Sequence, residues 1–374
     1  MISIAECLPL WVDQPQQVSE ILNDLLSQPI VAVDTESNSL HAYREQVCLM
    51  QFSTPNADYL VDPLTKLDLQ PFSELFASPA TIKIFHAGEY DLLCLKRDYG
   101  YSFNNLFDTM LAARILGYEK ISLADLIANE FGIHLDKRFQ KANWGQRPLP
   151  NNLREYACHD THYLIPLRNR LRDELIRRHL LELAEEDFQR LSQVTPNSQP
   201  HSLWERVRGA HELDGQQLAV LEELCRYRDT RARAINKPLF HILSDRALVN
   251  LADASPKNSK QLQKVEGIPR RLLERHAQGI LNAVQRGLQS APMHRKHHPR
   301  PSDAYLNRLE KLKQWRKHEA EKMNVLSDVV LPREILEEIA AQHPHTLHDL
   351  SHLMQTVPWR LTRYGEQILQ LIRD

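Results

Sequence analysis

Two acidic residues, Asp34 and Glu36, end the apolar and β-branched segment "IVAVDTE" (30–36). Residues i and i+2 of a strand share a face, so we expect these two carboxylates to point the same way. Neighbouring ionised carboxylates repel each other unless one is protonated or a cation lies between them. Because Mg²⁺ and Mn²⁺ prefer oxygen ligands, the pair indicates a divalent metal site; the alternative is a polar strand end at the solvent boundary.

Three further residues extend this pair into a pattern with chemical meaning. Asp91 follows a strand–Gly–helix junction in "FHAGEYDLL" (85–93), and Tyr156 and Asp160 lie four residues apart in "REYACHD" (154–160). A spacing of four puts two side chains on one face of a helix. Taken alone, Asp91 could be a first-turn helix acid, and Tyr156 could be a half-buried core aromatic. Together with the first pair, they are typical of the ligands and orienting phenol of a two-metal phosphodiesterase site.

The elements that would carry these residues follow from hydrophobic pattern and turn signals. Residues 30–36, 46–54, 57–63 and 81–87 are predicted strands, and the helix 89–100 begins after the glycine at 88. The pattern then becomes helical over three segments: 106–117, 122–132 and 151–178. Strands followed by helices, with at least one strand–helix unit, predict an α/β layer around a mixed sheet.

The C-terminal half contains a weak internal repeat. Residues 218–252 resemble residues 306–339, and each copy has an amphipathic helix, an irregular stretch and another helix. Two all-helical modules are therefore predicted. Polar linkers are expected at 191–202 and 290–303. A metal site built from the linker residues His294, His297 and His298 is the less favoured interpretation of the second linker.

Composition and charge limit the class of protein. Of the 374 residues, 42% are hydrophobic and 25% are charged, as in ordinary globular proteins, and there is no long apolar run that predicts a membrane span. Residues 201–374 carry 28 Lys+Arg and 21 Asp+Glu, against 18 and 27 in residues 1–200, and this asymmetry is compatible with a polyanionic partner. The five scattered cysteines and the lack of a signal-like N-terminus favour a reducing cytoplasm and argue against a structural zinc site.

The ordered acids resemble a known family. "VDTES" (33–37), "HAGEYDL" (86–92) and "YACHD" (156–160) resemble the three motifs of the DEDD superfamily of 3′–5′ exonucleases. Tyr156 lies four residues before Asp160, and Glu155 lies five before it, which resembles the tyrosine branch rather than the histidine branch.

The resemblance extends along the chain. Residues 123–164 resemble the segment that leads into the third motif of the ribonuclease D family, and the two helical repeats resemble HRDC domains. The resemblance implies an α/β ribonuclease H-like exonuclease domain at 1–192, followed by all-α HRDC domains at 211–290 and 302–374.

The resemblance also implies a function. It predicts a 3′–5′ exoribonuclease that releases nucleoside 5′-monophosphates with two divalent ions, Mg²⁺ or Mn²⁺, and that acts on tRNA precursors and other small structured RNAs in the cytoplasm. Asp34, Glu36, Asp91 and Asp160 would be the metal ligands. Asp34 would bridge the two ions, and Tyr156 would orient the attacking water.

Substrate contacts are predicted less directly. Leu40, four residues after Glu36, would wedge against the terminal base or else belong to the core. His86 and Trp144 are candidates for lining the substrate cleft, although Trp144 could equally be a buried tryptophan.

Two basic clusters in the helical modules suit phosphate contacts or solvated helix faces: Arg226, Arg228, Arg231 and Arg233 in the first module, and Lys311, Lys313, Arg316 and Lys317 in the second. The modules also carry acidic residues outside these clusters. This fits an arrangement in which one module binds RNA while the other packs mainly on the nuclease.

Two other functions are compatible with the sequence. A DNA exonuclease of the same superfamily would need the same acids, because RNA and DNA differ at the 2′-OH, whose contacts the sequence does not show. A non-catalytic RNA-binding scaffold would have no use for the complete set of acids.

Overall fold

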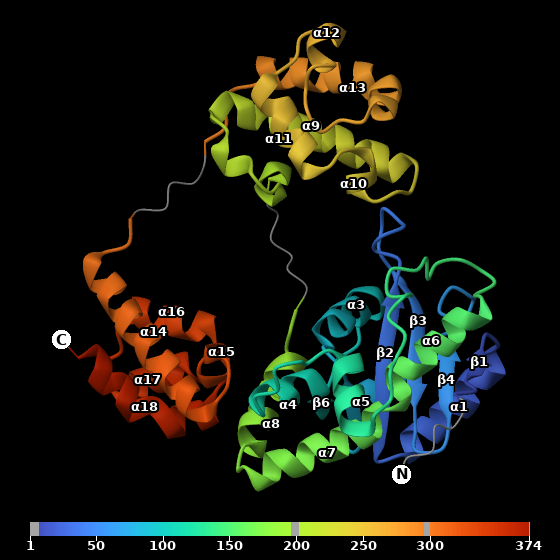
Figure 1. The fold of residues 1–374 in the computed structure, drawn as a ribbon, viewed down its shortest axis with the longest axis vertical. Helices are drawn as coiled ribbons and strands as arrows, with labels where there is room; N and C mark the ends of the chain where they lie inside the picture. The colour runs from blue at the N-terminus through green and yellow to red at the C-terminus, as the bar shows by residue number, and fades with distance from the viewer. Residues whose placement is uncertain (1–6, 196–201, 295–299, 374) are drawn as a thin grey trace. The chain divides into compact units, whose positions relative to one another are not determined.

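The computed structural model describes residues 7–195, 202–294 and 300–373 (Figure 1). The chain divides into two compact units. The first unit contains Met1–Ser37, Val47–Pro196 and Arg300–Asp374, and the second contains Asn38–Gln46 and Asn197–Pro299. The candidate residues 297 and 298 of the second linker lie outside the described residues, as do residues 196–201 of the first. No helix among the described residues is long and apolar enough to cross a membrane.

A six-stranded mixed sheet forms the centre of the first unit. Its strands are β1 (Leu10–Val12), β2 (Ile30–Ser37), β3 (Val47–Ser53), β4 (Asp58–Val61), β5 (Ile82–Phe85) and β6 (Leu106–Asp108). They are arranged in the order β1-β4-β3-β2-β5-β6. Strand β3 is antiparallel to both β2 and β4, whereas β1 pairs with β4, β2 with β5 and β5 with β6 in parallel. The predicted α/β fold with a mixed sheet is confirmed.

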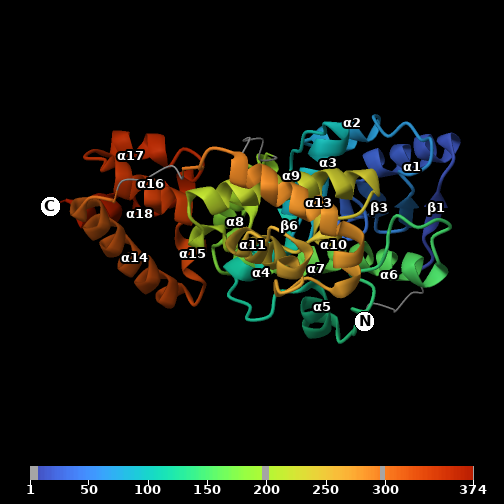
Figure 2. The same ribbon diagram turned by 90° about the horizontal axis from the view of Figure 1, so that it is seen from above.

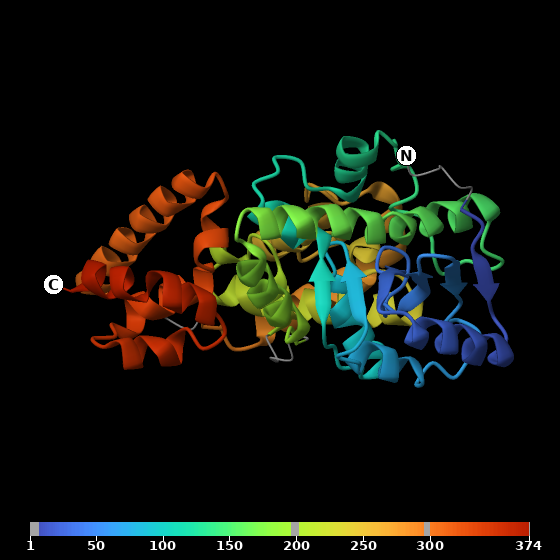
Figure 3. The same ribbon diagram turned by 90° about the horizontal axis from the view of Figure 1, so that it is seen from below.

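Helices cover both faces of this sheet. They are α1 (Pro15–Ser27), α2 (Phe72–Ala77), α3 (Glu89–Tyr99), α4 (Thr109–Ile115), α5 (Leu123–Phe131), α6 (Asn151–His162), α7 (Leu164–Arg177) and α8 (Leu181–Ser192). Figure 3 shows the green helices α6 and α7 on one side of the strands and the blue helix α1 on the other.

The alternation of side chains along β2 determines on which face of the sheet Asp34 and Glu36 lie. Val31 and Val33 pack into the core that includes residues of α1, α2 and α3. Ala32, between them, packs into the opposite core with residues of α7. Because a strand alternates with a period of two, Asp34 and Glu36 continue the face of Ala32 and lie on the side covered by α6 and α7.

The second unit contains a helical bundle. Its helical elements are two 3-10 turns, η1 (Leu203–Arg206) and η2 (Ala210–Glu212), and the α-helices α9 (Gly215–Ala234), α10 (Leu239–Ile242), α11 (Asp245–Ala254), α12 (Ser259–Leu262) and α13 (Arg270–Gln289). The long helices α9 and α13 lie side by side (Figure 2). Their contact is close, because a Cβ on Gly287 of α13 would lie 2.4 Å from the Val220 Cα of α9.

A similar bundle completes the first unit. It contains α14 (Asp303–Met323), α15 (Ser327–Val330), α16 (Arg333–Gln342), α17 (Leu347–Leu353) and α18 (Pro358–Ile372). Each helix has a counterpart in the same order among α9 to α13, so the predicted repeat of two all-helical modules is confirmed. Helix α18 packs on α8, and the fully buried Arg360 pairs there with Glu186 and Asp187.

Several predicted elements differ from the observed ones. The strand β1 and the helix α1 were not predicted, although Pro15 at the first helical position is a helix-start signal. Residues 106–108 form β6 rather than the beginning of a helix, because Asp108 accepts a hydrogen bond from the Leu111 backbone N–H and starts α4 at Thr109. The predicted helix 151–178 is divided in two at Tyr163.

Candidate active site

Strand β2 presents the first two acids. Asp34 pairs with Gln51 and Glu36 with Leu49 in the antiparallel register of β3. The register shifts between Glu36 and Ser37, so regular pairing is interrupted directly after the second acid. The two carboxylates therefore project from the last regular part of a strand whose preceding residues are buried core.

The turn between β5 and α3 positions the third acid. Ala87 has a φ of 58°, and a Cβ on Gly88 would lie 2.5 Å from the Phe85 Cβ, so glycine is required at this close approach. The Gly88 backbone N–H donates to the Asp108 carboxylate at 2.8 Å. This fixed turn places Asp91, which is 6% exposed, in the first turn of α3.

Helix α6 supplies the remaining two residues. Its buried residues Leu153 and Ala157 pack with Trp144 in one core cluster, and Tyr156 packs against that cluster. The Ser53 hydroxyl in β3 donates to the Thr161 hydroxyl of α6 at 2.7 Å, which ties the helix to the sheet. Tyr156 and Asp160 therefore face the end of strand β2 that carries Asp34 and Glu36.

The structure brings the predicted acids together. Carboxylate oxygens of Asp34, Glu36 and Asp160 all lie within 4.8 Å of one another. Asp91 lies beside them, because the backbone N–H of Thr35, between Asp34 and Glu36, donates to its Oδ1 at 3.1 Å. The Thr35 hydroxyl donates to the same oxygen. No lysine, arginine or histidine of the described chain pairs with any of the four acids.

The electrostatics of this cluster are unfavourable without a cation. Burial raises the pKa of Asp34 well above its ordinary value, and the charges of Asp91, Asp160 and Glu36 raise it further. The pKa of Glu36 is also raised, by burial and then by Asp160 and Asp91. Burial raises the pKa of Asp160 to about 8 and that of Asp91 to about 7.

The donor set fits hard divalent cations. Four carboxylates offer only oxygen atoms, which are the ligands of Mg²⁺ and Mn²⁺, and no thiolate or imidazole that would favour softer metals stands among them. Bound cations would remove the mutual repulsion that raises the carboxyl pKa values. Asp34, Glu36, Asp91 and Asp160 are therefore the residues that would hold such ions.

The raised pKa values predict an unusual pH dependence of stability. A carboxyl whose pKa is higher in the folded than in the unfolded protein binds more protons when folded, so the metal-free protein should lose stability as the pH rises from about 4 to about 8. Mg²⁺ held by these carboxylates would replace the protons, and its stabilising effect should therefore be larger at about pH 8.5 than at about pH 5.5. Thermal unfolding with EDTA and with Mg²⁺ at both pH values measures this. An equal shift of Tm by Mg²⁺ at the two pH values would contradict it.

A cavity adjoins the acid cluster. It has a volume of about 700 Å³, and its lining includes Tyr156 and Asp160 together with Arg138, Phe139 and His159. The phenol of Tyr156 contacts the ring of Phe139 edge-on, with the ring centroids 5.8 Å apart. The cavity therefore has both a polar and an aromatic wall.

The three predicted substrate residues have different surroundings. His86 is partly buried, its Nδ1 lies 2.9 Å from the Thr109 hydroxyl, and burial lowers the pKa of its imidazole to about 4. It therefore offers a neutral ring at neutral pH. Leu40 is 42% exposed and belongs to the second unit, so it is not a core leucine.

Trp144 corrects a prediction. Its side chain is 1% exposed and packs in the core beneath α6, with its ring 6.0 Å from that of Tyr156. No face of the indole is open to a base, because the surrounding apolar side chains cover it. Trp144 therefore packs against Tyr156 from the core side. This agrees with the alternative prediction, that Trp144 is a buried tryptophan.

Only some residues of the two predicted basic clusters in the helical modules are exposed and could contact RNA phosphates. Arg228 is buried and pairs with Asp245 at 2.7 Å, and Arg316 is half-buried and donates to the Leu331 carbonyl. These two arginines stabilise their own bundles. Arg226, Arg231 and Arg233 in the first module are exposed, although Arg226 pairs with Glu222 and Arg233 with Asp229. The three predicted lysines of the second module are also exposed: Lys311, Lys313 and Lys317.

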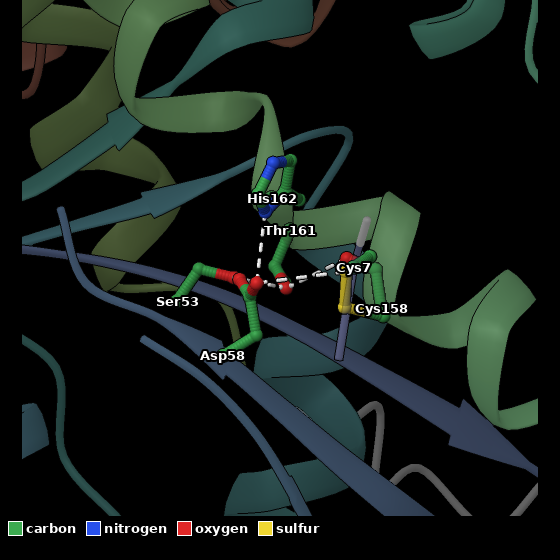
Figure 4. The surroundings of a disulfide bond; sticks show 6 residues. All are labelled: Cys7, Ser53, Asp58, Cys158, Thr161 and His162. Carbon is green, nitrogen blue, oxygen red and sulfur yellow. Dashed lines mark hydrogen bonds and ion pairs between the residues drawn. A yellow bond between two sulfur atoms is a disulfide. The ribbon is translucent and has the colours of Figure 1, made fainter. Parts of the chain in front are cut away.

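A disulfide bond joins Cys7 to Cys158 in α6, which differs from the prediction of five reduced cysteines (Figure 4). The Cys7 sulfur lies 3.5 Å from the Asp58 carboxylate, which in turn lies 2.8 Å from the His162 Nδ1. Cys7, Asp58 and His162 form a second group of ligand-type atoms. The Cys7 sulfur, however, is bonded to Cys158 and is not a thiolate.

This bond should contribute measurably to stability. It closes a loop with a sequence separation of 151 residues, and we expect its reduction to cost on the order of 2–4 kcal/mol. Denaturant unfolding with and without a thiol reductant measures the difference, and Cys7→Ser should abolish the effect of the reductant while Cys94→Ser should not. Without reductant, the unfolded protein should show three reactive thiols; five would contradict the pairing.

Two positioning residues were not identified from sequence. Thr35 lies between the two acids of β2 and holds Asp91 through its backbone N–H and its hydroxyl. Asp108 was placed inside a helix, although it caps α4 and anchors the Gly88 turn. The aspartate preceding a short apolar run was an available helix-start signal for Asp108. No local signal identified the contact between Thr35 and Asp91, which are 56 residues apart.

Comparisons with known proteins agree with this architecture. A family model described as 3′-5′ exonuclease matches residues 9–176, and the HRDC domain model matches residues 217–284 and 306–372. Ribonuclease D of Pseudomonas paraeruginosa is 28% identical over 97% of each chain. Protein RRP6-like 1 of Arabidopsis thaliana is 31% identical over 75% of this chain and 46% of its own length.

The structure gives a similar result. The catalytic core of RRP6 from Trypanosoma brucei superposes with a TM-score of 0.67 at 26% identity, over 78% of this chain and 82% of that one. The chain spans less than half the length of the two plant relatives that it matches. The solved core and the full-length bacterial relative therefore compare with this chain over most of their length, and the plant relatives extend well beyond it.

Proposed function

The chain belongs to the 3′–5′ exonucleases that carry HRDC domains, the group that includes ribonuclease D, and from this premise we propose that it is a metal-dependent 3′–5′ exoribonuclease. The proposed reaction is hydrolysis of the last phosphodiester bond of an RNA with a free 3′-OH, which releases a nucleoside 5′-monophosphate. The proposed substrates are tRNA precursors and small structured RNAs. The proposed setting is still the cytoplasm, but the cysteines no longer support it, because Cys7 and Cys158 form a disulfide bond.

One observation carries this proposal. Four carboxylates from β2, α3 and α6 converge without any counter-charge from the described chain, at considerable electrostatic cost. Such a cluster is favourable only when it binds cations. Divalent ions held by these carboxylates would supply an activated water and would neutralise charge on the leaving 3′-oxygen. A scaffold that only binds RNA gains nothing from this arrangement.

The four acids are assigned different roles in holding the ions. The charges of Asp91, Asp160 and Glu36 all act on Asp34, and this supports Asp34 as the acid most involved in holding the ions. Glu36 and Asp160 are within reach of the same site as Asp34. Asp91 accepts the hydrogen bonds of Thr35 through Oδ1, so Oδ2 would be the oxygen available to hold an ion.

Tyr156 is assigned an orienting role. Burial raises the pKa of its phenol above its ordinary value, and the charges of Asp160, Glu36 and Asp34 raise it further. The hydroxyl therefore keeps its proton at neutral pH and donates a hydrogen bond instead of acting as a base. Its place beside the cavity would let it hold the attacking water in line with the scissile bond.

The helical modules are assigned to RNA binding and to packing. The exposed Arg231 and Arg233 of the first module suit sequence-independent phosphate contacts. The second module contacts α8 of the nuclease through the buried Arg360, so part of its surface is used for packing. Binding of RNA should weaken with salt, as it does when phosphate contacts dominate.

The test uses the full chain and a 5′-labelled single-stranded RNA. Parallel reactions contain the same RNA with a 3′-phosphate and a DNA copy with a free 3′-OH. We expect a ladder that shortens from the free 3′ end of the RNA, no shortening of the blocked RNA, and weak digestion of DNA. Equal digestion of DNA would favour the DNA exonuclease alternative. RNA binding without digestion would favour a scaffold.

A further inference from the structure

A buried amide opposite Asp34 has no assigned role. Gln51 of β3 is fully buried, and neither its Nε2 nor its Oε1 has a hydrogen-bond partner among the described residues. Buried polar side chains almost always have a partner, because leaving water without one is unfavourable. An amide that lacks one among the described residues therefore points to a partner outside the protein chain, such as a bound water or a ligand.

The strand register shows where this amide lies. Gln51 is the direct partner of Asp34 in the antiparallel pair, so both side chains stand on the same face of the sheet, with their Cβ atoms about 5 Å apart. Leu49 and Ser53, two residues away on either side, share that face. Ser53 contacts Thr161 of α6, and Leu49 packs in the core beneath α6. Gln51 is therefore enclosed between the sheet and the helix that carries Asp160.

We propose that Gln51 is a positioning residue for the metal site, whose side-chain amide holds the Asp34 carboxylate and an ordered water beside it when divalent ions are bound. This inference rests on the proposed function. Its chemical basis is that carboxylate ligands of metals are themselves held by outer hydrogen bonds, which orient them. An amide suits this place because it adds a donor and an acceptor without adding a fifth negative charge.

The discriminating variant is Gln51→Leu, which has a similar size and lacks polar atoms. Mn²⁺ is titrated into the metal-free protein, and the free ion is followed by electron paramagnetic resonance. We expect Mn²⁺ to bind about 10-fold or more weakly to the variant than to the wild type. The Tm of the metal-free variant should equal or exceed that of the wild type, since a buried amide without partners has been removed.

Two further variants make the result specific. Met50→Leu changes the neighbouring buried residue on the opposite face of β3 and should leave Mn²⁺ affinity unchanged. Gln51→Asn keeps the amide on a shorter side chain and should recover part of the affinity. Equal Mn²⁺ affinity of Gln51→Leu and wild type would overturn the inference, as would a lower Tm of the metal-free variant in proportion to the lost affinity.

Different results would overturn the role of Gln51 and the proposed function. A wild-type protein that binds Mn²⁺ and shortens RNA, beside a Gln51→Leu variant with the same Mn²⁺ affinity, would overturn only the role of Gln51. A wild-type protein that binds no Mn²⁺ would overturn both this role and the proposed function.

Discussion

Replacement of Asp34 by asparagine should reduce the exonuclease rate about 10³-fold while leaving the fold intact. Asparagine has nearly the same shape but no charge, and Asp34 is the acid on which the charges of all three other acids act. The loss of several kcal/mol of charge stabilisation in the transition state corresponds to this factor. The rate is measured as nucleotide release from RNA with Mg²⁺ in excess.

The stability of the same variant separates catalysis from structure. Removing one charge relieves repulsion, so the metal-free Asp34→Asn protein should unfold at an equal or higher Tm than the wild type at about pH 8. Asp68→Asn, at an exposed position away from the site, serves as the matched control and should keep full activity. A variant of Asp34 that loses stability along with activity, or keeps its activity, would contradict the assignment.

The second large effect concerns the contact between α8 and α18. Arg360 is fully buried, and its guanidinium pairs with Glu186 and Asp187 and also donates to the Val329 carbonyl at 2.8 Å. Removing one partner of a buried ion pair leaves an uncompensated charge, so we expect Arg360→Met to lower the free energy of unfolding by about 3–5 kcal/mol. Chemical denaturation measures this loss, and the exposed Arg363→Met is the matched control.

The charge that remains on Glu186 in Arg360→Met should make the loss of stability depend on pH. Burial already raises the pKa of Glu186, although Arg360 opposes the effect. Without Arg360, this carboxyl should be protonated more readily, so the loss of stability should shrink at acidic pH. The double variant Arg360→Met with Glu186→Gln should recover much of the stability. Equal stability of Arg360→Met and the wild type at neutral pH would show that the contact contributes little.

The sequence was most informative where local pattern and chemistry coincide. The acids of β2 and α6 could be predicted to share faces, because strand and helix periodicities are local properties of "IVAVDTE" and "REYACHD". The repeat in the C-terminal half likewise predicted two similar bundles, because each copy has the same order of amphipathic helices. The short strands β1 and β6 were missed, since three residues carry too little pattern.

The rest of the site depends on contacts between distant residues. The hydrogen bonds from Thr35 to Asp91, and the register that places Gln51 opposite Asp34, are set by tertiary packing and strand pairing. The burial of Trp144 was an open alternative because a tryptophan suits both a core and a stacking platform. The disulfide between Cys7 and Cys158 also has no local signal, since the two cysteines are 151 residues apart.

The most direct test of metal-dependent 3′–5′ hydrolysis of RNA is the identity of the released product and its dependence on metal. Purified full-length protein is incubated with RNA that has a free 3′-OH, in Mg²⁺ and in EDTA, and the released nucleotides are separated by chromatography. We expect nucleoside 5′-monophosphates in Mg²⁺ and none in EDTA. Nucleoside 3′-monophosphates, or the same release in EDTA, would contradict a hydrolysis that depends on metal ions held by Asp34, Glu36, Asp91 and Asp160.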